Sequence, residues 1–134
     1  MSKPEAKYFD LVTTGIGYVN RLRHVTPQEG EPFWSVSIAA LRGSVDEAQY
    51  VHFECRVSGK QAQEVVSRLQ PAVEGNAKVL IGFTLSDLQP ETYRRKRGER
   101  AGTTGVSIRT RLLRIAWVKV DGQPFYSEDR QRAA

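Results

Sequence analysis

The stretch QYVHFECRVSGKQAQEVVSRL, residues 49–69, decides the fold because its hydrophobic period changes at its centre. Over residues 49–57 apolar side chains alternate with polar ones, and this period of two predicts a β-strand with one buried face. The apolar residues that follow are spaced as on one side of an α-helix: Ala62, Val65, Val66 and Leu69. The stretch therefore predicts a strand that leads directly into a short helix.

Local signals predict where this helix begins and ends. Ser58 and Gln61 fit a capping box, in which both side chains satisfy free backbone amides at the start of a helix. Pro71, and after it Gly75-Asn76, are expected to stop the helix.

Period-two alternation elsewhere predicts four further strands, at residues 15–25, 33–41, 78–86 and 106–120. In the last of these, Leu113, Ile115 and Trp117 are expected on the outer face. Arg114 falls on the apolar face, so we expect either a β-bulge that turns it outward or the end of the sheet at that point. Asp121-Gly122 then predicts a two-residue hairpin turn that leads residues 125–126 back onto the sheet.

The order of these elements predicts a mainly β protein. Five strands with one short helix between the third and the fourth match the layout of the OB-fold, a five-stranded Greek-key barrel. The OB-fold domain is expected to cover residues 13–126 and to carry a basic loop at residues 87–105. Residues 1–12 and 127–134 are expected to be flexible segments.

Composition narrows the class of protein. The chain has 134 residues, of which 40% are hydrophobic and 26% charged, as in an ordinary soluble domain. No apolar run approaches the roughly 18 residues of a membrane span, and the polar N-terminal sequence MSKPEAKYFD predicts a cytoplasmic protein. Its one cysteine, Cys55, excludes an internal disulfide and a cysteine-cluster metal site, and it lies on the apolar face of its strand.

Positive charge is concentrated in one part of the chain. The net charge is +5, yet residues 94–114 hold eight of the 20 Lys and Arg residues and only one of the 15 Asp and Glu residues. A local basic patch is the electrostatic footprint of a polyanion site. The other interpretation is a solvent-exposed loop whose charges serve only solubility.

The chain resembles the bacterial single-stranded-DNA-binding proteins. The resemblance is carried by GYVNR at residues 17–21, FWSVSIA at 33–39, the third strand ending in Gly59-Lys60, and the lysine-led KVLI at 78–81. It covers roughly residues 15–120 and rests on the order and spacing of these segments. The chain is also similar, more narrowly, to small proteins of unassigned function encoded on integrating conjugative elements. Both likenesses imply an SSB-like OB-fold in the replication or transfer of a mobile element.

The chain departs from that family at two points. Its C-terminal sequence, EDRQRAA at residues 128–134, replaces the flexible linker and acidic tip through which those proteins recruit partners, so recruitment by that route is not expected. The stacking tryptophans of the family also lack clean counterparts. His52 lies about where one is expected, and Trp34 is displaced toward the start of its strand.

A non-specific single-strand site needs cations for phosphates and flat side chains for bases. The candidate nucleic-acid-binding residues are Arg21, Arg23, Trp34, Tyr50, His52, Arg56, Tyr93, Arg94, Arg95, Lys96, Arg97, Arg100, Arg109, Arg111 and Trp117. For Trp34 the alternative is core packing, for Trp117 packing in an oligomer interface, and for His52 a plain surface position.

The sequence gives catalysis little support. Gly15-Ile16-Gly17 lacks the third glycine and the following helix of a dinucleotide-binding loop. The two histidines, His24 and His52, lie in different strands without metal-ligand spacing. We therefore expect no enzyme activity, no cofactor and no metal.

The predicted function is single-stranded DNA binding by a homo-oligomer, a dimer or tetramer joined through the outward Leu113, Ile115 and Trp117. The alternatives are an OB-fold adaptor that docks an acidic protein partner, and RNA binding.

Overall fold

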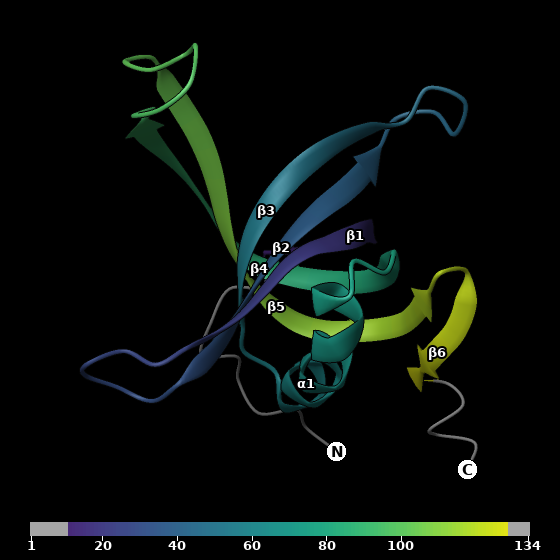
Figure 1. Cartoon of the computed structure of the whole chain (residues 1–134). Helices are drawn as coiled ribbons and strands as arrows, with labels where there is room; N and C mark the ends of the chain where they lie inside the picture. Colours follow the sequence, from purple (N-terminus) through teal and green to yellow (C-terminus); the bar gives the residue numbers. More distant parts are fainter. Residues whose placement is uncertain (1–10, 129–134) are drawn as a thin grey trace, which may run out of the picture.

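A computed structural model of the protein describes residues 11–128, and in that range the chain is mainly β (Figure 1). The elements in chain order are β1 (Val12–Val25), β2 (Phe33–Arg42), β3 (Gln49–Val57), α1 (Lys60–Glu74), β4 (Val79–Arg94), β5 (Thr104–Val120) and β6 (Gln123–Ser127). Residues 1–10 and 129–134, most of the two predicted flexible segments, lie outside the described residues. No helix within residues 11–128 is long and apolar enough to cross a membrane.

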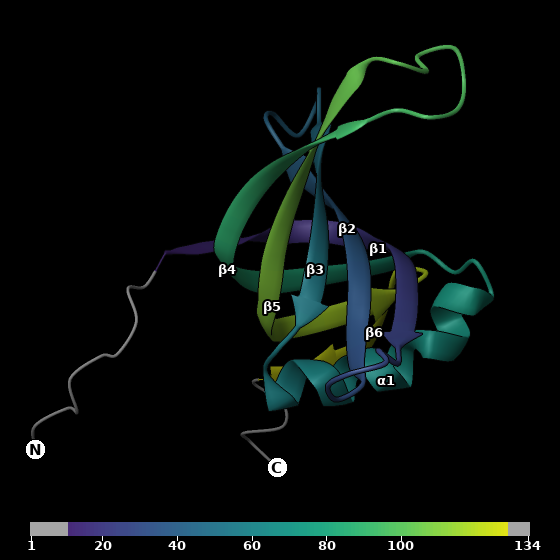
Figure 2. The ribbon, with the colours of Figure 1, turned by 90° about the vertical axis from the view of Figure 1, so that its left-hand side faces the viewer.

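The first five strands close on themselves. The sheet has the order β3-β2-β1-β4-β5-β6, and an additional pairing joins β3 to β5. This closing pair is parallel and runs from Phe53↔Ile108 to Val57↔Leu112, whereas all other neighbours are antiparallel. Figure 2 shows β5, β3 and β2 side by side, with α1 at one end and the β4–β5 hairpin at the other. The result is a barrel-like sheet with a sixth strand attached to β5.

Apolar side chains fill the inside of this sheet, as the alternation predicts. Phe53, Cys55 and Val57 of β3 are buried, and so are the alternating residues Val79, Ile81, Phe83 and Leu85 of β4. The predicted helical stripe is confirmed, because the buried residues of α1 are Ala62, Val65, Val66 and Leu69. Burial of these apolar surfaces is the main stabilising contribution to the fold.

The predicted signals at the ends of α1 are partly wrong. The N-cap is Gly59 without a side-chain cap, because the backbone N–H groups of Ser58 and Gly59 instead donate to the carbonyl of Leu112. A Cβ at position 59 would collide with the carbonyl of Leu113, so this close approach requires glycine. Pro71 lies inside the helix on its exposed side, where solvent can bind the carbonyl that its missing N–H leaves free, and Gly75 forms the C-cap.

Strand β5 contains the predicted bulge, and because of it one residue lies on the opposite side of the sheet from the side predicted. Leu85 pairs with Leu112 and Thr84 with Arg114, so Leu113 is extra and the alternation shifts by one residue. Arg114 consequently points outward, and Ile115, expected on the outer face, is completely buried. The outward apolar set predicted for this strand is therefore reduced to Leu113 and Trp117.

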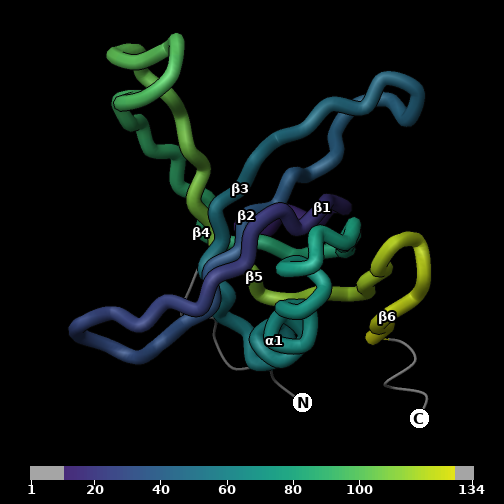
Figure 3. The backbone as a smooth tube through the Cα atoms, viewed as in Figure 1, coloured from purple at the N-terminus to yellow at the C-terminus, as the bar shows by residue number. Residues whose placement is uncertain are grey.

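The prediction that residues 87–105 form a loop is wrong. Strand β4 continues to Arg94 and pairs with β5 as far as Arg94↔Thr104, so most of the segment forms a long antiparallel hairpin (Figure 3). Both faces of this two-stranded ribbon are largely exposed. Without a buried face, its sequence shows no apolar alternation from which a strand is predicted.

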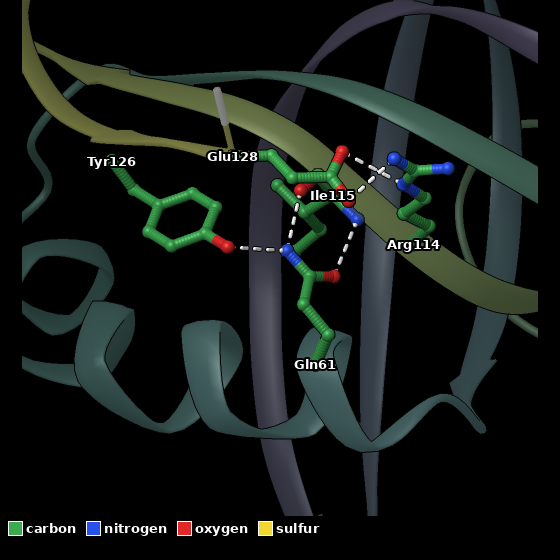
Figure 4. A network of polar contacts seen from close by, with 5 residues as sticks. All are labelled: Gln61, Arg114, Ile115, Tyr126 and Glu128. Atoms are coloured by element: carbon green, nitrogen blue, oxygen red, sulfur yellow. Dashed lines mark hydrogen bonds and ion pairs between the residues drawn. The ribbon is translucent and has the colours of Figure 1, made fainter. Parts of the chain in front are cut away.

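Strand β6 and helix α1 are tied to the same part of β5 (Figure 4). Asp121 and Gly122 have positive φ angles of 49° and 81°, which confirms the predicted hairpin turn into β6. The side chain of Gln61 accepts a hydrogen bond from the N–H of Ile115 at 3.0 Å and donates to its carbonyl at 2.6 Å and to the Tyr126 hydroxyl at 2.9 Å. Gln61 therefore acts across the barrel end instead of capping its own helix.

Glu128, the residue directly after β6, also contacts β5. Arg114 donates from Nε to Glu128 at 2.8 Å and forms an ion pair with the same carboxylate. Ser127 and Glu128, the first residues of the predicted tail 127–134, are thus part of the folded sheet region.

Candidate nucleic-acid interface

Strand register places five arginines on the outer side of the closed sheet. In one row Arg23 of β1 lies opposite Ser35, which lies opposite Arg56, which in turn lies opposite Arg111. The next row has the same arrangement: Arg21, Ser37, Glu54 and Arg109. Residues directly opposite on neighbouring strands point to the same side of a sheet. We call the exposed set Arg21, Arg23, Arg56, Arg109 and Arg111 the arginine face.

Small side chains run along the middle of this face. Ser35, Ser37 and Ala39 occupy the outer side of β2, with the longer side chains of β1 and β3 on both sides. Since neighbouring strands are about 4.8 Å apart, β1 and β3 are separated by roughly 10 Å. We call this strip of small residues, flanked by longer and partly charged side chains of β1 and β3, the trough.

Acidic side chains neutralise part of the arginine face. Glu91 pairs with Arg109 at 2.7 Å and Asp87 with Arg111 at 3.4 Å, and both arginine side chains remain more than half exposed. Glu54, which lies between Ser37 and Arg109 in the second row, accepts a hydrogen bond from Ser37 at 2.6 Å. Within residues 11–128, the other three arginines of the face form no ion pair.

The hairpin tip, residues 94–103, carries the densest positive charge. It holds Arg94, Arg95, Lys96, Arg97 and Arg100 against one acid, Glu99. The Arg95 side chain fixes the turn by donating to the Thr103 hydroxyl at 3.1 Å and the Thr104 carbonyl at 2.8 Å. Among the described residues, none of the five cations of the tip has a carboxylate within ion-pair distance. Figure 1 shows the tip projecting away from the closed sheet. Arg94, Lys96, Arg97 and Arg100 are exposed, and Arg95 is half-buried.

Two grooves lie along the outer side of β3 and meet at His52. The first, of about 450 Å³, is lined by Tyr18, Asn20, Ala39, Tyr50, His52 and Lys78, among others. The second, of about 330 Å³, lies toward the hairpin and includes His52, Glu54, Glu91, Tyr93 and Arg109. Tyr50 and Tyr93 are each about half exposed, so their rings are accessible from solvent. Flat side chains are thus found on both sides of His52.

The two tryptophans lie apart from these grooves. Trp34 is half-buried against the core, and its ring contacts that of His24 at an interplanar angle of 50°, with centroids 4.7 Å apart. Trp117 lies opposite Gly82 of β4 and Ser127 of β6, and its indole fills the space where a Cβ at position 82 would lie. The structure therefore brings together the predicted residues of β1, β3, the hairpin and the first half of β5, but not the tryptophans.

Several residues of this surface were not predicted from the sequence. Tyr18 and Lys78 line the first groove, and Asp87 and Glu91 pair with arginines. The outward position of Tyr18 follows from a register shift at Asn20, for which the sequence carries only the weak signal of an asparagine within a strand. The ion pairs depend on hairpin register, which the exposed ribbon does not reveal.

The single cysteine lies away from this surface, in the core. Burial raises the pKa of the Cys55 thiol to about 12, although a hydrogen bond from the Thr110 hydroxyl at 3.1 Å acts in the opposite direction. The reactive thiolate is therefore scarce at neutral pH. Among residues 11–128, no group of three or more His, Cys, Asp and Glu side chains is arranged to hold a metal ion.

Fold and surface together define a mainly β protein whose closed sheet carries a basic outer face with aromatic side chains. The chain matches, over residues 2–134, the model of a family described as "Protein of unknown function (DUF3577)", and it belongs to that family. No curated protein and no solved structure matches the chain.

Proposed function

We propose that this protein binds single-stranded DNA with little sequence preference. The observation that carries the proposal is the register of β1, β2, β3 and β5, which gathers the arginine face around a trough beside the hairpin tip. A polynucleotide presents phosphates at regular intervals, and several exposed cations along one path match that pattern better than a small anion does.

The topology supports the same proposal. The closed ring runs β1-β2-β3-β5-β4 and back to β1, with one helix between β3 and β4. We interpret this ring as an OB-fold to which β6 has been added, a fold that commonly presents oligonucleotide sites on such a face. Fold alone does not determine function, so the proposal depends mainly on the charged and aromatic side chains.

In the proposed complex, two kinds of contact act together. The hairpin tip and the arginines of β1 and β3, which form no ion pair within residues 11–128, neutralise phosphates and release counterions, which supplies most of the affinity. The exposed rings of Tyr50, His52 and Tyr93 stack on bases, which favours single strands over duplex because only unpaired bases expose their faces.

The proposed role is binding and not catalysis, in the cytoplasm and in the replication or transfer of a mobile element, as the sequence resemblance implies. We also propose that the protein forms a homo-oligomer. The apolar surface available to join its subunits is smaller than predicted, because Leu113 is 37% exposed and Trp117 is half-buried, whereas Ile115 lies inside the sheet.

A second candidate is an adaptor that docks an acidic protein segment on the same surface. The ion pairs of Arg109 and Arg111 favour it, because a face that already holds carboxylates can exchange them for those of a partner. RNA binding would use the same contacts as DNA binding.

A fluorescence-anisotropy titration distinguishes these candidates. A labelled thymidylate ~30-mer, the matching ribo-oligomer and a duplex of equal length are compared at two salt concentrations. Tight, salt-sensitive binding that favours the deoxy single strand is expected. Equal affinity for duplex contradicts the stacking contribution, tighter ribo-oligomer binding favours RNA, and weak binding to all three favours the adaptor.

A further inference from the structure

The first groove lies at the end of the trough and has a different chemistry from its neighbour. Tyr18 of β1 lies opposite Ala39 of β2, and Ala39 lies opposite His52 of β3, so two rings stand on either side of a methyl group. Tyr50 adds a third ring from the same side of β3. Among residues 11–128, no carboxylate lines this groove, whereas Glu54 and Glu91 line the second one.

A bulge in β1 shapes the groove. The register with β2 shifts between Val19 and Arg21, so Asn20 is the extra residue. Bulges re-aim side chains next to binding sites, and this one places Asn20 in the groove lining beside Tyr18. An asparagine amide can donate to and accept from the edge of a base.

Within the part of the chain that the structure describes, one cation belongs to the lining. Lys78, just before β4, borders the groove, and Arg21 lies in the next outward row of β1. The volume of about 450 Å³ is within the range of about 300–1,000 Å³ that holds small organic ligands. Aromatic walls, an amide and one cation are the groups that bind a flat, polar ring attached to a phosphate.

We propose that this groove is a base-binding subsite, in which Tyr18, Tyr50 and His52 hold one unstacked nucleobase of a strand whose phosphates follow the arginine face. The inference rests on the proposed function, because it assigns the base contacts of the same surface. It also separates two tasks: the hairpin tip binds any polyanion, and the groove requires a base.

Two oligomers of equal length and charge test this assignment. One is thymidylate, and the other has the same sugar-phosphate chain without bases. Since one stacked base contributes a factor of about 5 to 150 in affinity, the unmodified protein is expected to prefer thymidylate by at least fivefold.

The double variant Tyr50→Ala/His52→Ala removes two exposed rings and leaves the half-buried Tyr18 in place. It is expected to lose most of the preference for thymidylate while its affinity for the abasic oligomer and its salt slope stay unchanged. Tyr50→Phe keeps a ring and is expected to retain the preference. Phe125→Ala, which removes a comparably exposed ring from β6, is the matched control and is expected to change neither affinity.

The outcomes are distinguishable. Equal affinity of the unmodified protein for both oligomers overturns the subsite and the stacking contribution to the proposed function, and leaves binding through phosphate contacts standing. An undiminished preference in the double variant overturns the subsite and leaves the proposed function standing. An equal loss for both oligomers in the double variant also overturns it, because the rings then act on the phosphate contacts or the fold. Absence of binding to either oligomer overturns the proposed function and the subsite together. Displacement of the oligomer by comparable concentrations of free thymidine monophosphate would assign the groove to a nucleotide instead of a polymer.

Discussion

The two ends of the closed sheet use polar side chains in opposite ways. At the end covered by α1 and β6, Gln61 makes three hydrogen bonds to Ile115 and Tyr126, and Arg114 is paired with Glu128. At the other end, the hairpin tip holds five cations, none of which has a carboxylate within ion-pair distance in residues 11–128. One end satisfies its polar groups internally, and the other leaves its charges available.

This difference separates stability from binding. Partnered groups in a partly buried setting stabilise the fold, because an unsatisfied partner would carry a desolvation penalty. Clustered like charges at an exposed tip repel one another and add nothing to stability. We therefore expect substitutions of the tip cations other than Arg95, which holds the turn, to change ligand affinity, and substitutions at the helix end to change stability.

The largest effect is expected at the hairpin tip. Replacing Arg94, Lys96, Arg97 and Arg100 with glutamine, while Arg95 is kept to hold the turn, removes four phosphate-binding charges. Affinity for a thymidylate oligomer should fall on the order of a hundredfold at about 0.1 M salt, and the salt slope should decrease by about 3. Anisotropy titrations over a salt series measure both quantities.

The control for this variant removes cations from the helix end. Lys60→Gln/Arg68→Gln changes two exposed charges on α1 and should leave the salt slope nearly unchanged. Equal slopes for the tip variant and the unmodified protein would exclude the tip as the phosphate site.

The next largest effect is on stability. Gln61→Ala removes the partner of both backbone groups of Ile115, which is buried, and should lower the free energy of unfolding by about 1–3 kcal/mol. Gln63→Ala, on the exposed side of α1, should cost much less. Urea unfolding measures both variants, and similar stabilities would show that the network does not stabilise the barrel end. Affinity for thymidylate should be the same in both.

A smaller effect is expected from the acids on the arginine face. Glu91→Gln frees Arg109 from an exposed ion pair and removes a charge that repels phosphate. Since exposed pairs contribute about 0–1 kcal/mol, affinity should rise by up to about fivefold, with little change in stability. Glu64→Gln on α1 removes the same charge far from the face and should have no effect on affinity. A drop in affinity for Glu91→Gln would mean that the ion pair positions Arg109 for binding.

The smallest effect concerns Cys55. Its folded-state pKa is raised from 9.0 to about 12, so its contribution to stability is complete below about pH 9 and is lost as the pH rises toward 12. At about pH 8, iodoacetamide should modify the thiol only after unfolding in urea. Mass spectrometry measures the extent of modification, and rapid modification of the folded protein would contradict the burial of Cys55 inside the sheet.

Much of the barrel is predictable from sequence because its elements have one buried face. The alternation in residues 49–57 and the helical stripe from Ala62 to Leu69 both report a boundary between core and solvent. The hairpin ribbon has no such boundary, and its strands were predicted as a loop. Ile115 was misplaced because a bulge shifts the alternation after Leu112, and a bulge changes parity without a reliable sequence signal.

The candidate site was predictable in its composition but not in its arrangement. Clustered arginines at residues 94–114 are visible in the sequence. Which of them is paired depends on contacts such as Arg109 with Glu91, and the contribution of Arg23 depends on a row across four strands. Such long-range register is a tertiary property, set by closure of the sheet and not by local pattern.

An NMR titration of ¹⁵N-labelled protein with a thymidylate oligomer reports both ends of the molecule at once and so shows which end binds DNA. We expect amide shifts at the hairpin tip, along the trough on β2 and β3, and around the first groove, with little change in α1 and β6. Shifts concentrated on α1 and β6, or no shifts on addition of the oligomer, would contradict it.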